Sequence, residues 1–329
     1  MAGAVRRVAG FAGAAAMVPY AVIKTSWVVG ALAGVLPAGE GFGTAGWVVL
    51  NAVTVGMAAA GIGLSLALTR PAWSARFPVW LLLLFAWIGA GFLVPMLPYS
   101  VVAALLGADP DDPPADGGGD GSPMPGWEGA LIGVGFGGLA IGLAVALPIH
   151  LRERWPDAFH GRVRLPGTGG DSRTGCKSRP AGTAVTAVAA SAAVAAADLY
   201  WAAGGSLGIV RPEHREPAWR LMTGNSGLWA LLGCVSVLVL AGGRRAGRLP
   251  VVLPISAAWI ASGSLFAWGA WKLPFAAYLA SRADGEVPWP EDLAVVAARD
   301  AVALVAGAAV LSVVLSAHRS RRAARPAGG

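Results

Sequence analysis

The stretch Lys24-Thr-Ser-Trp27-Val-Val-Gly30-Ala-Leu-Ala-Gly34 returns later in the chain as Asp198-Leu-Tyr-Trp201-Ala-Ala-Gly204-Gly-Ser-Leu-Gly208. A charged residue, a tryptophan and two glycines recur at one offset, because each of the four pairs of positions is separated by 174 residues. Both copies lie inside long apolar segments. The pattern predicts a duplicated set of membrane-spanning helices, with a lysine in one copy where the other has an aspartate.

The composition favours a membrane protein over a soluble one. Of the 329 residues, 56% are hydrophobic and only 13% are charged, whereas a soluble domain carries about a quarter charged residues. Apolar runs of about 20 residues, enough to cross the hydrocarbon core of a bilayer, recur along the chain. We therefore predict an all-α polytopic protein of the plasma membrane, with eight helices at about 9–36, 46–69, 77–106, 129–151, 184–205, 226–242, 250–275 and 296–317.

The basic residues predict the orientation of these helices. Lys and Arg gather at the N-terminus, around 70–76, in 152–179, in 243–248 and in the C-terminal tail. Under the positive-inside rule, eight spans with both termini in the cytoplasm place all of these segments on one side. The net charge of +7 then indicates contact with anionic lipids at the cytoplasmic face and not with nucleic acid.

The duplication predicts two tandem four-helix repeats. We assign the first repeat to 1–151, a basic linker to 152–183, the second repeat to 184–318 and a basic tail to 319–329. An acidic loop at 109–120 lies on the opposite side from the linker. Because each repeat has an even number of spans, both run in the same direction, and a pseudo-two-fold axis along the membrane normal would relate them.

Glycines and prolines predict local features of these spans. Gly129, Gly133, Gly137, Gly138 and Gly142 favour close packing of the span at 129–151 against a neighbour, as a structural element. Pro95, with Pro98 one turn later, predicts a bend in the span at 77–106.

One part of the second copy resembles a known signature. Asp198-Leu-Tyr200-Trp201-Ala-Ala-Gly204-Gly205 is similar to the first-helix pattern, roughly His-x-Tyr-Trp-Ala-x-Gly-Gly, of small four-helix bacterial membrane proteins of unknown function. This chain has Asp198 where that family has His, and the first repeat keeps only Trp27 and Gly30. The resemblance implies a duplicated, actinobacterial relative of such units and implies no activity.

Lys24 and Asp198 are the first candidates for a functional site. On a helix, Tyr20, Lys24, Trp27, Gly30 and Gly34 share one face, as do the corresponding residues around Asp198. A charge in mid-membrane is costly unless it is paired or hydrated. The pair is therefore either a buried ion pair that fixes the register of the two repeats or the site of a transporter or permease for a small solute or ion, with candidate residues Lys24, Asp198, Trp27, Trp201, Tyr20 and Tyr200.

Three further charged residues lie near the outer ends of the last two spans. Lys272 is interpreted as an interface anchor or a ligand-binding residue, and Arg299 and Asp300 either pair with it or with loop acids, or line an outer vestibule. Gly204-Gly-Ser206-Leu-Gly208 matches G-x-S-x-G without the strand-to-helix elbow that a hydrolase needs. His150 and His318 are interpreted as interfacial caps. We predict no metal or cofactor site and no complete catalytic constellation.

Overall fold

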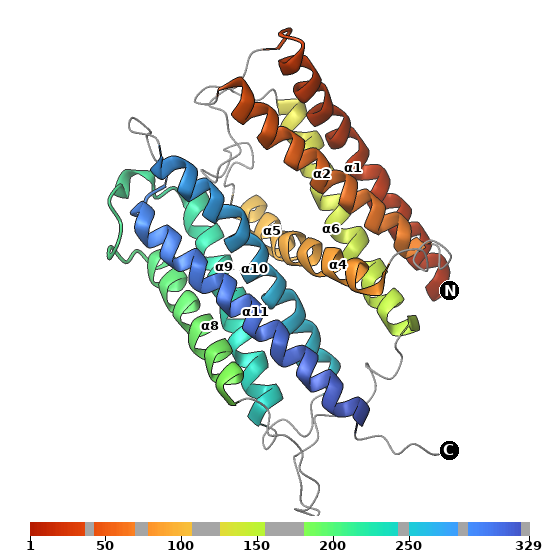
Figure 1. The fold of residues 1–329 in the computed structure, drawn as a ribbon, viewed down its shortest axis with the longest axis vertical. Helices are drawn as coiled ribbons and strands as arrows, with labels where there is room; N and C mark the ends of the chain where they lie inside the picture. The colour runs from red at the N-terminus through yellow and green to blue at the C-terminus, as the bar shows by residue number, and fades with distance from the viewer. Residues whose placement is uncertain are drawn as a thin grey trace, which may run out of the picture. The chain divides into compact units, whose positions relative to one another are not determined.

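The computed structural model describes residues 1–36, 43–69, 78–106, 126–154, 181–242, 250–281 and 289–323. Within these ranges the chain is all-α, as predicted, without a β-strand, and Ile209 and Glu291 form an isolated β-bridge. The helices (Figure 1) are α1 (Ala2–Leu32), α2 (Thr44–Thr69), α4 (Val79–Leu93), α5 (Met96–Leu106), α6 (Gly126–Arg154), α8 (Ala181–Ala202), η1 (Pro212–His214), α9 (Pro217–Gly242), α10 (Val252–Ala280) and α11 (Leu293–Ala323).

Eight spans in the described part of the chain are long and apolar enough to cross a membrane, which confirms the predicted number. The chain is therefore a multi-pass membrane protein. Helices α4 and α5 together form one of these spans, Val79–Leu106. They are separated at Val94 and Pro95, because proline lacks the N–H that would continue the helical hydrogen bonds. The bend predicted at Pro95 is thus a break, whereas Pro98 lies inside α5.

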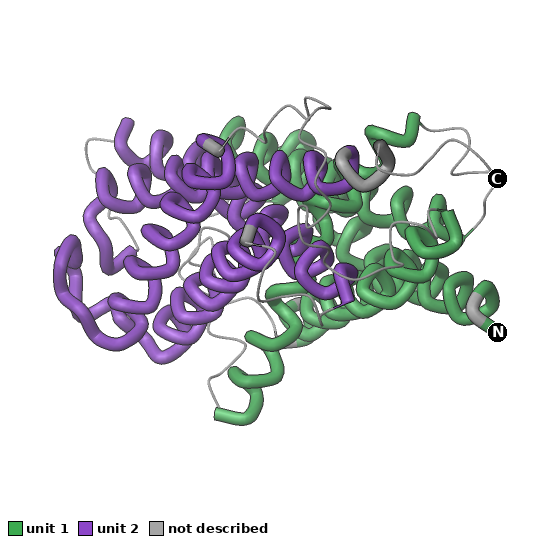
Figure 2. The backbone as a smooth tube through the Cα atoms, turned by 90° about the horizontal axis from the view of Figure 1, so that it is seen from below, with its two compact units in different colours: residues 1–154 green, residues 155–329 purple. Residues whose placement is uncertain are grey.

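The chain divides into two compact units, Met1–Arg154 and Trp155–Gly329 (Figure 2), and each contains four spans. In unit 1, α1 packs against both α2 and α6. In unit 2, α8, α9, α10 and α11 each contact the next, and α11 returns to α8, which closes a four-helix ring. This division agrees in position with the predicted repeats, and the duplication itself stays a prediction. The basic linker from 155 to 180 and the acidic loop 109–120 lie outside the described residues.

Two of the five glycines quoted in α6 explain its close contact with α1. A Cβ at Gly142 would lie 2.8 Å from the Ala9 carbonyl oxygen and 2.9 Å from the Gly13 Cα, and a Cβ at Gly138 would collide with the Ala16 side chain. Such spacing lets two helix backbones approach each other. Gly133 and Gly137 face open space, whereas Gly138 and Gly142 have the predicted packing role.

Several predicted helix boundaries were wrong. Helix α9 begins at Pro217, not near 226, because Pro suits the first turn of a helix and polar residues are tolerated where a span leaves the hydrocarbon. Helices α10 and α11 extend to Ala280 and Ala323. Gly34, Gly204 and Gly208, which we had placed on helix faces, lie beyond the helix ends with positive φ of 68°, 103° and 79°. They reverse the chain after α1 and α8, a conformation that favours glycine.

Candidate functional site

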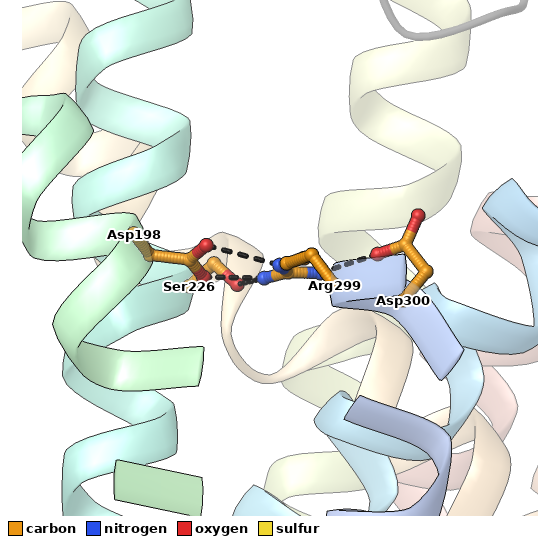
Figure 3. Close-up of polar contacts among 4 residues, drawn as sticks. All are labelled: Asp198, Ser226, Arg299 and Asp300. Atoms are coloured by element: carbon orange, nitrogen blue, oxygen red, sulfur yellow. Dashed lines mark hydrogen bonds and ion pairs between the residues drawn. The ribbon is translucent and has the colours of Figure 1, made fainter. Parts of the chain in front are cut away.

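An ion pair between a fully buried aspartate and an arginine whose side chain is 13% exposed joins α8 to α11 in unit 2. Asp198 is 1% exposed. Its Oδ1 accepts a hydrogen bond from Arg299 Nε at 2.9 Å, and its Oδ2 accepts a second from Arg299 Nη2 (Figure 3). This two-pronged geometry is the strongest form of carboxylate–guanidinium pairing. Both oxygens of Asp198 are therefore bonded to Arg299, a partner that we had not assigned to it.

The same guanidinium reaches two more side chains. Its Nη2 donates to Ser226 Oγ of α9 at 2.6 Å, and its Nη1 donates to Asp300 Oδ1 at 2.6 Å. Asp300 is fully buried, at 0% exposed, and its Oδ2 has no hydrogen-bond partner. In Figure 3 that second oxygen points away from Arg299. One guanidinium is thus shared between two carboxylates, and the Asp300 Oδ2 atom remains without a hydrogen-bond partner.

The fourth helix of unit 2 adds a second positive charge. Lys272 of α10 is close enough to Asp300 to interact with it electrostatically. We use the name charge centre for Asp198, Ser226, Lys272, Arg299 and Asp300, which come from all four helices of unit 2. With every acid and base ionised, its charges sum to zero only if Lys272 is counted.

Two glycines let the helices close around the charge centre. A Cβ at Gly227 would lie 3.0 Å from the Asp198 Cβ, and one at Gly269 would lie 2.8 Å from the Asp300 carbonyl oxygen. Any larger residue at either position would push α9 from α8, or α10 from α11. The sequence therefore places glycine on each neighbouring helix at the level of the charged residues, which lets the helices approach closely there.

The charge centre lies a short distance inside one end of the bundle. Asp198 is four residues before the end of α8 and Arg299 six residues after the start of α11, which corresponds to about 6 Å and about 9 Å of helix. The chain segments at 203–211 and 289–292 meet over this end, and together we call them the end loop. Val210 N and Arg211 N donate to Pro290 O at 2.9 and 3.0 Å, and Asp292 N donates to Gly208 O at 2.9 Å.

Tyr200 and Trp201 hold this end loop. The Trp201 Nε1–H donates to Leu207 O at 2.8 Å, and the Tyr200 hydroxyl accepts from the Ser206 and Leu207 N–H groups at 3.1 and 3.2 Å. Arg215 donates to the carbonyls of Gly204 and Gly205 from the other side. The polar atoms of Tyr200 and Trp201, two of the aromatic residues that we proposed for substrate binding, are therefore hydrogen-bonded to the loop.

On the opposite side of the charge centre lies a layer of small apolar residues. Val194, Ala230 and Ala303 are each one helical turn from Asp198, Ser226 and Arg299, respectively, and they pack together with Leu265 and Ala306 in one buried cluster. Val194 is 2% exposed, and Ala230 and Ala303 are 0% exposed. We call these five residues the alanine layer, and the charge centre lies between this layer and the end loop.

Lys24 occupies a different environment in unit 1. Its Nζ lies 3.7 Å from the Trp27 ring centroid and 5.9 Å from that of Tyr20, and Trp27 stacks on Trp47 of α2 with centroids 5.7 Å apart. Lys24 is only 9% exposed, so it does not extend to the surface as an interfacial lysine would. The aromatic faces attract its ammonium. Trp47 was not among the predicted site residues, and its ring contributes to this site through the stack on Trp27.

The structure therefore groups the predicted residues differently from the prediction. Asp198 joins Arg299 and Asp300 in unit 2, where both carboxylates are buried and the Arg299 side chain is 13% exposed. The outer vestibule stays a prediction. Lys24 joins Tyr20 and Trp27 in unit 1. The proposed meeting of Lys24 with Asp198 stays a prediction. Ser226 was missed because it fell at the expected start of a span.

Two weaker candidate residues, Ser206 and His150, can also be located in the structure. Ser206 lies in the turns that follow α8, and no strand leads into it in the described residues, so the serine-hydrolase geometry is not formed there. His150 is buried at the end of α6, where Arg6 Nη1 of α1 lies 3.2 Å from its Nδ1 and 3.2 Å from Glu153 Oε2. This contact ties α1 to α6 at their shared end.

Comparisons of the chain with protein-family models, with curated proteins and with solved structures found no match.

Proposed function

We propose that this chain is a permease-like protein of the plasma membrane, with both termini in the cytoplasm, and that the charge centre of unit 2 is where it engages a small solute or ion. The observation that carries the proposal is the Asp198–Arg299–Asp300 triad, enclosed among four spans. Ionisable residues at such depth are expensive and by default mark a pathway or a relay. The basic segments face anionic lipids on the cytoplasmic side.

The surroundings of the triad support an occluded site. On one side, the end of the bundle is closed by backbone hydrogen bonds between 208–211 and 290–292 and by the loop contacts of Tyr200, Trp201 and Arg215. On the other side, the alanine layer consists mostly of residues without long side chains to interlock. Neither barrier requires unfolding to open, since helices that meet through small residues can separate by rigid-body movement.

A structural role is the second candidate, and one observation favours it. Arg299 satisfies both oxygens of Asp198, and Gly227 and Gly269 allow the helices to close tightly at that level. A buried ion network of this kind can fix the register of packed helices without any transport. In that case the centre would stay closed to water in every state of the protein.

Solvent access distinguishes the two candidates without knowledge of the solute. In a background with Cys176 and Cys234 replaced by alanine, we would introduce Val194→Cys, one turn below Asp198, and measure its reaction with a charged, membrane-impermeant methanethiosulfonate in proteoliposomes. Leu207→Cys, 79% exposed in the end loop, is the positive control. Ala187→Cys, 0% exposed and deeper in α8, reports unfolding.

A permease opens its centre, so we expect Val194→Cys to react more slowly than Leu207→Cys but clearly faster than Ala187→Cys. Reaction of Val194→Cys at the rate of Ala187→Cys would mean that the centre stays shut, and the permease proposal would fail in favour of the structural one. Equal, fast reaction at all three positions would show a protein that has unfolded, which the helix content by circular dichroism checks before labelling.

A further inference from the structure

We infer that Asp300 is a proton-exchange site, so that the ion coupled to opening of the charge centre is a proton. The inference deepens the proposed permease function and rests on it. The observation behind it is the Asp300 Oδ2 atom, which is buried and has no hydrogen-bond donor although its sister oxygen accepts from Arg299. A buried acceptor without a donor is costly, most of all when it is charged, and a proton bound there removes the charge.

Charges of both signs surround Asp300, so some favour the protonated form of its carboxyl group and others favour the ionised form. Asp198 from α8 repels its negative form, while Arg299 from α11 and Lys272 from α10 attract it. From α9 comes the Ser226 hydroxyl, whose bond is to Arg299 and not to Asp300. Two carboxylates that share one guanidinium cannot both be fully compensated. The remaining negative charge is balanced either by Lys272 or by a proton.

The two carboxylates are not equivalent, and this selects Asp300 as the proton carrier. Protonation of Asp198 would break one of the two bonds of a bidentate pair with Arg299. Protonation of Asp300 at Oδ2 leaves its Oδ1 free to keep the bond from Arg299 Nη1. Asp300 can therefore gain and lose a proton while the α8–α11 ion pair stays intact, and the helix contact through Gly269 lies directly beside it.

The test is the infrared spectrum of the reconstituted full chain as a function of pH. A protonated carboxylic acid has a C=O stretching band that a carboxylate lacks and that shifts in D2O. We expect such a band under mildly acidic conditions, lost as pH rises with about a tenfold change in the protonated-to-ionised ratio per pH unit. The band should be absent in Asp300→Asn.

Two matched variants test whether the infrared band belongs to Asp300. Asp198→Asn should keep the Asp300 band, and so should Asp292→Asn, which changes an acid at the N-terminal cap of the same helix. A second measurement is modification by the apolar reagent dicyclohexylcarbodiimide, which adds to protonated carboxyls. We expect peptide mass spectrometry to find the adduct on Asp300, with a rate that falls as pH rises.

A spectrum of Asp300→Asn with the same pH-dependent band as the unaltered protein would overturn the inference, as would a band that is lost in Asp198→Asn instead. This failure differs from that of the proposed function. If Val194→Cys reacts but no Asp300 band exists, the centre opens without this proton. If the band exists but Val194→Cys stays unreactive, Asp300 titrates inside a closed scaffold, and the permease proposal is the one that fails.

Discussion

Replacing Arg299 by methionine removes the group on which the charge centre depends. The change keeps an unbranched side chain of moderate length but deletes four hydrogen bonds, two to Asp198 and one each to Ser226 and Asp300. It leaves two carboxylates that are 1% and 0% exposed without their shared cation. Removing one partner of a buried ion pair costs about 3–5 kcal/mol, so we expect the unfolding free energy to fall by about this amount.

The assay is titration of the detergent-solubilised protein with sodium dodecyl sulfate in mixed micelles, followed by circular dichroism. Arg220→Met, an exposed arginine at the start of α9, is the matched control and should change stability by less than about 0.5 kcal/mol. Combining Asp198→Asn with Arg299→Met should cost less than the sum of the two single changes, with a coupling energy of about 2 kcal/mol.

Some results of these stability measurements would contradict the buried triad. A loss below about 1 kcal/mol for Arg299→Met is the value of a solvent-exposed pair, and it would mean that Arg299 does not form the buried triad. Strict additivity in the Asp198–Arg299 cycle would contradict their direct contact. A large loss in Arg220→Met as well would show that removal of any arginine disturbs the protein, and the loss in Arg299→Met could not then be assigned to the triad.

Three further predictions concern the rest of the molecule. Gly142→Leu should separate α1 from α6 and lower stability by about 1–3 kcal/mol as an overpacked contact, whereas Gly137→Leu, which faces open space, should be close to neutral in the same titration; equal losses would contradict the assigned interface. Tyr200→Phe removes the acceptor of two loop N–H groups, so we expect faster amide hydrogen exchange at 206 and 207 and unchanged exchange in α9. Lys24→Met should leave the protein inserted and helical, lose about 0.5–2 kcal/mol of cation–π attraction and alter the Trp27 fluorescence; an unchanged emission spectrum would argue against the contact.

The sequence was sufficient for the fold class because the bilayer restricts the possibilities. Apolar runs of spanning length can only be helices, so the eight spans followed from composition. Helix ends were less predictable. The start of α9 at Pro217 was missed because hydropathy reports the hydrocarbon boundary, whereas a helix continues into the headgroup region as long as its backbone is hydrogen-bonded.

The candidate site was only partly predictable. Asp198, Arg299 and Asp300 stood out because charges in spanning segments need an explanation, but the partner of Asp198 depends on which helices adjoin. The repeat suggested Lys24, whereas the packing of α8 against α11 provides Arg299. A charge balance within the second repeat alone would have suggested Arg299 as the partner of Asp198. Arg299 is the basic residue next to Asp300, the other acid in the spans of that repeat.

Opening of the charge centre is tested most directly by the reaction of Val194→Cys in sealed vesicles, with the impermeant reagent added either outside or inside. A permease must expose its centre to each side in turn, so we expect reaction from both sides, each faster than that of Ala187→Cys. Reaction from neither side would contradict the central claim that the Asp198–Arg299–Asp300 centre opens, and would leave it as a structural ion network.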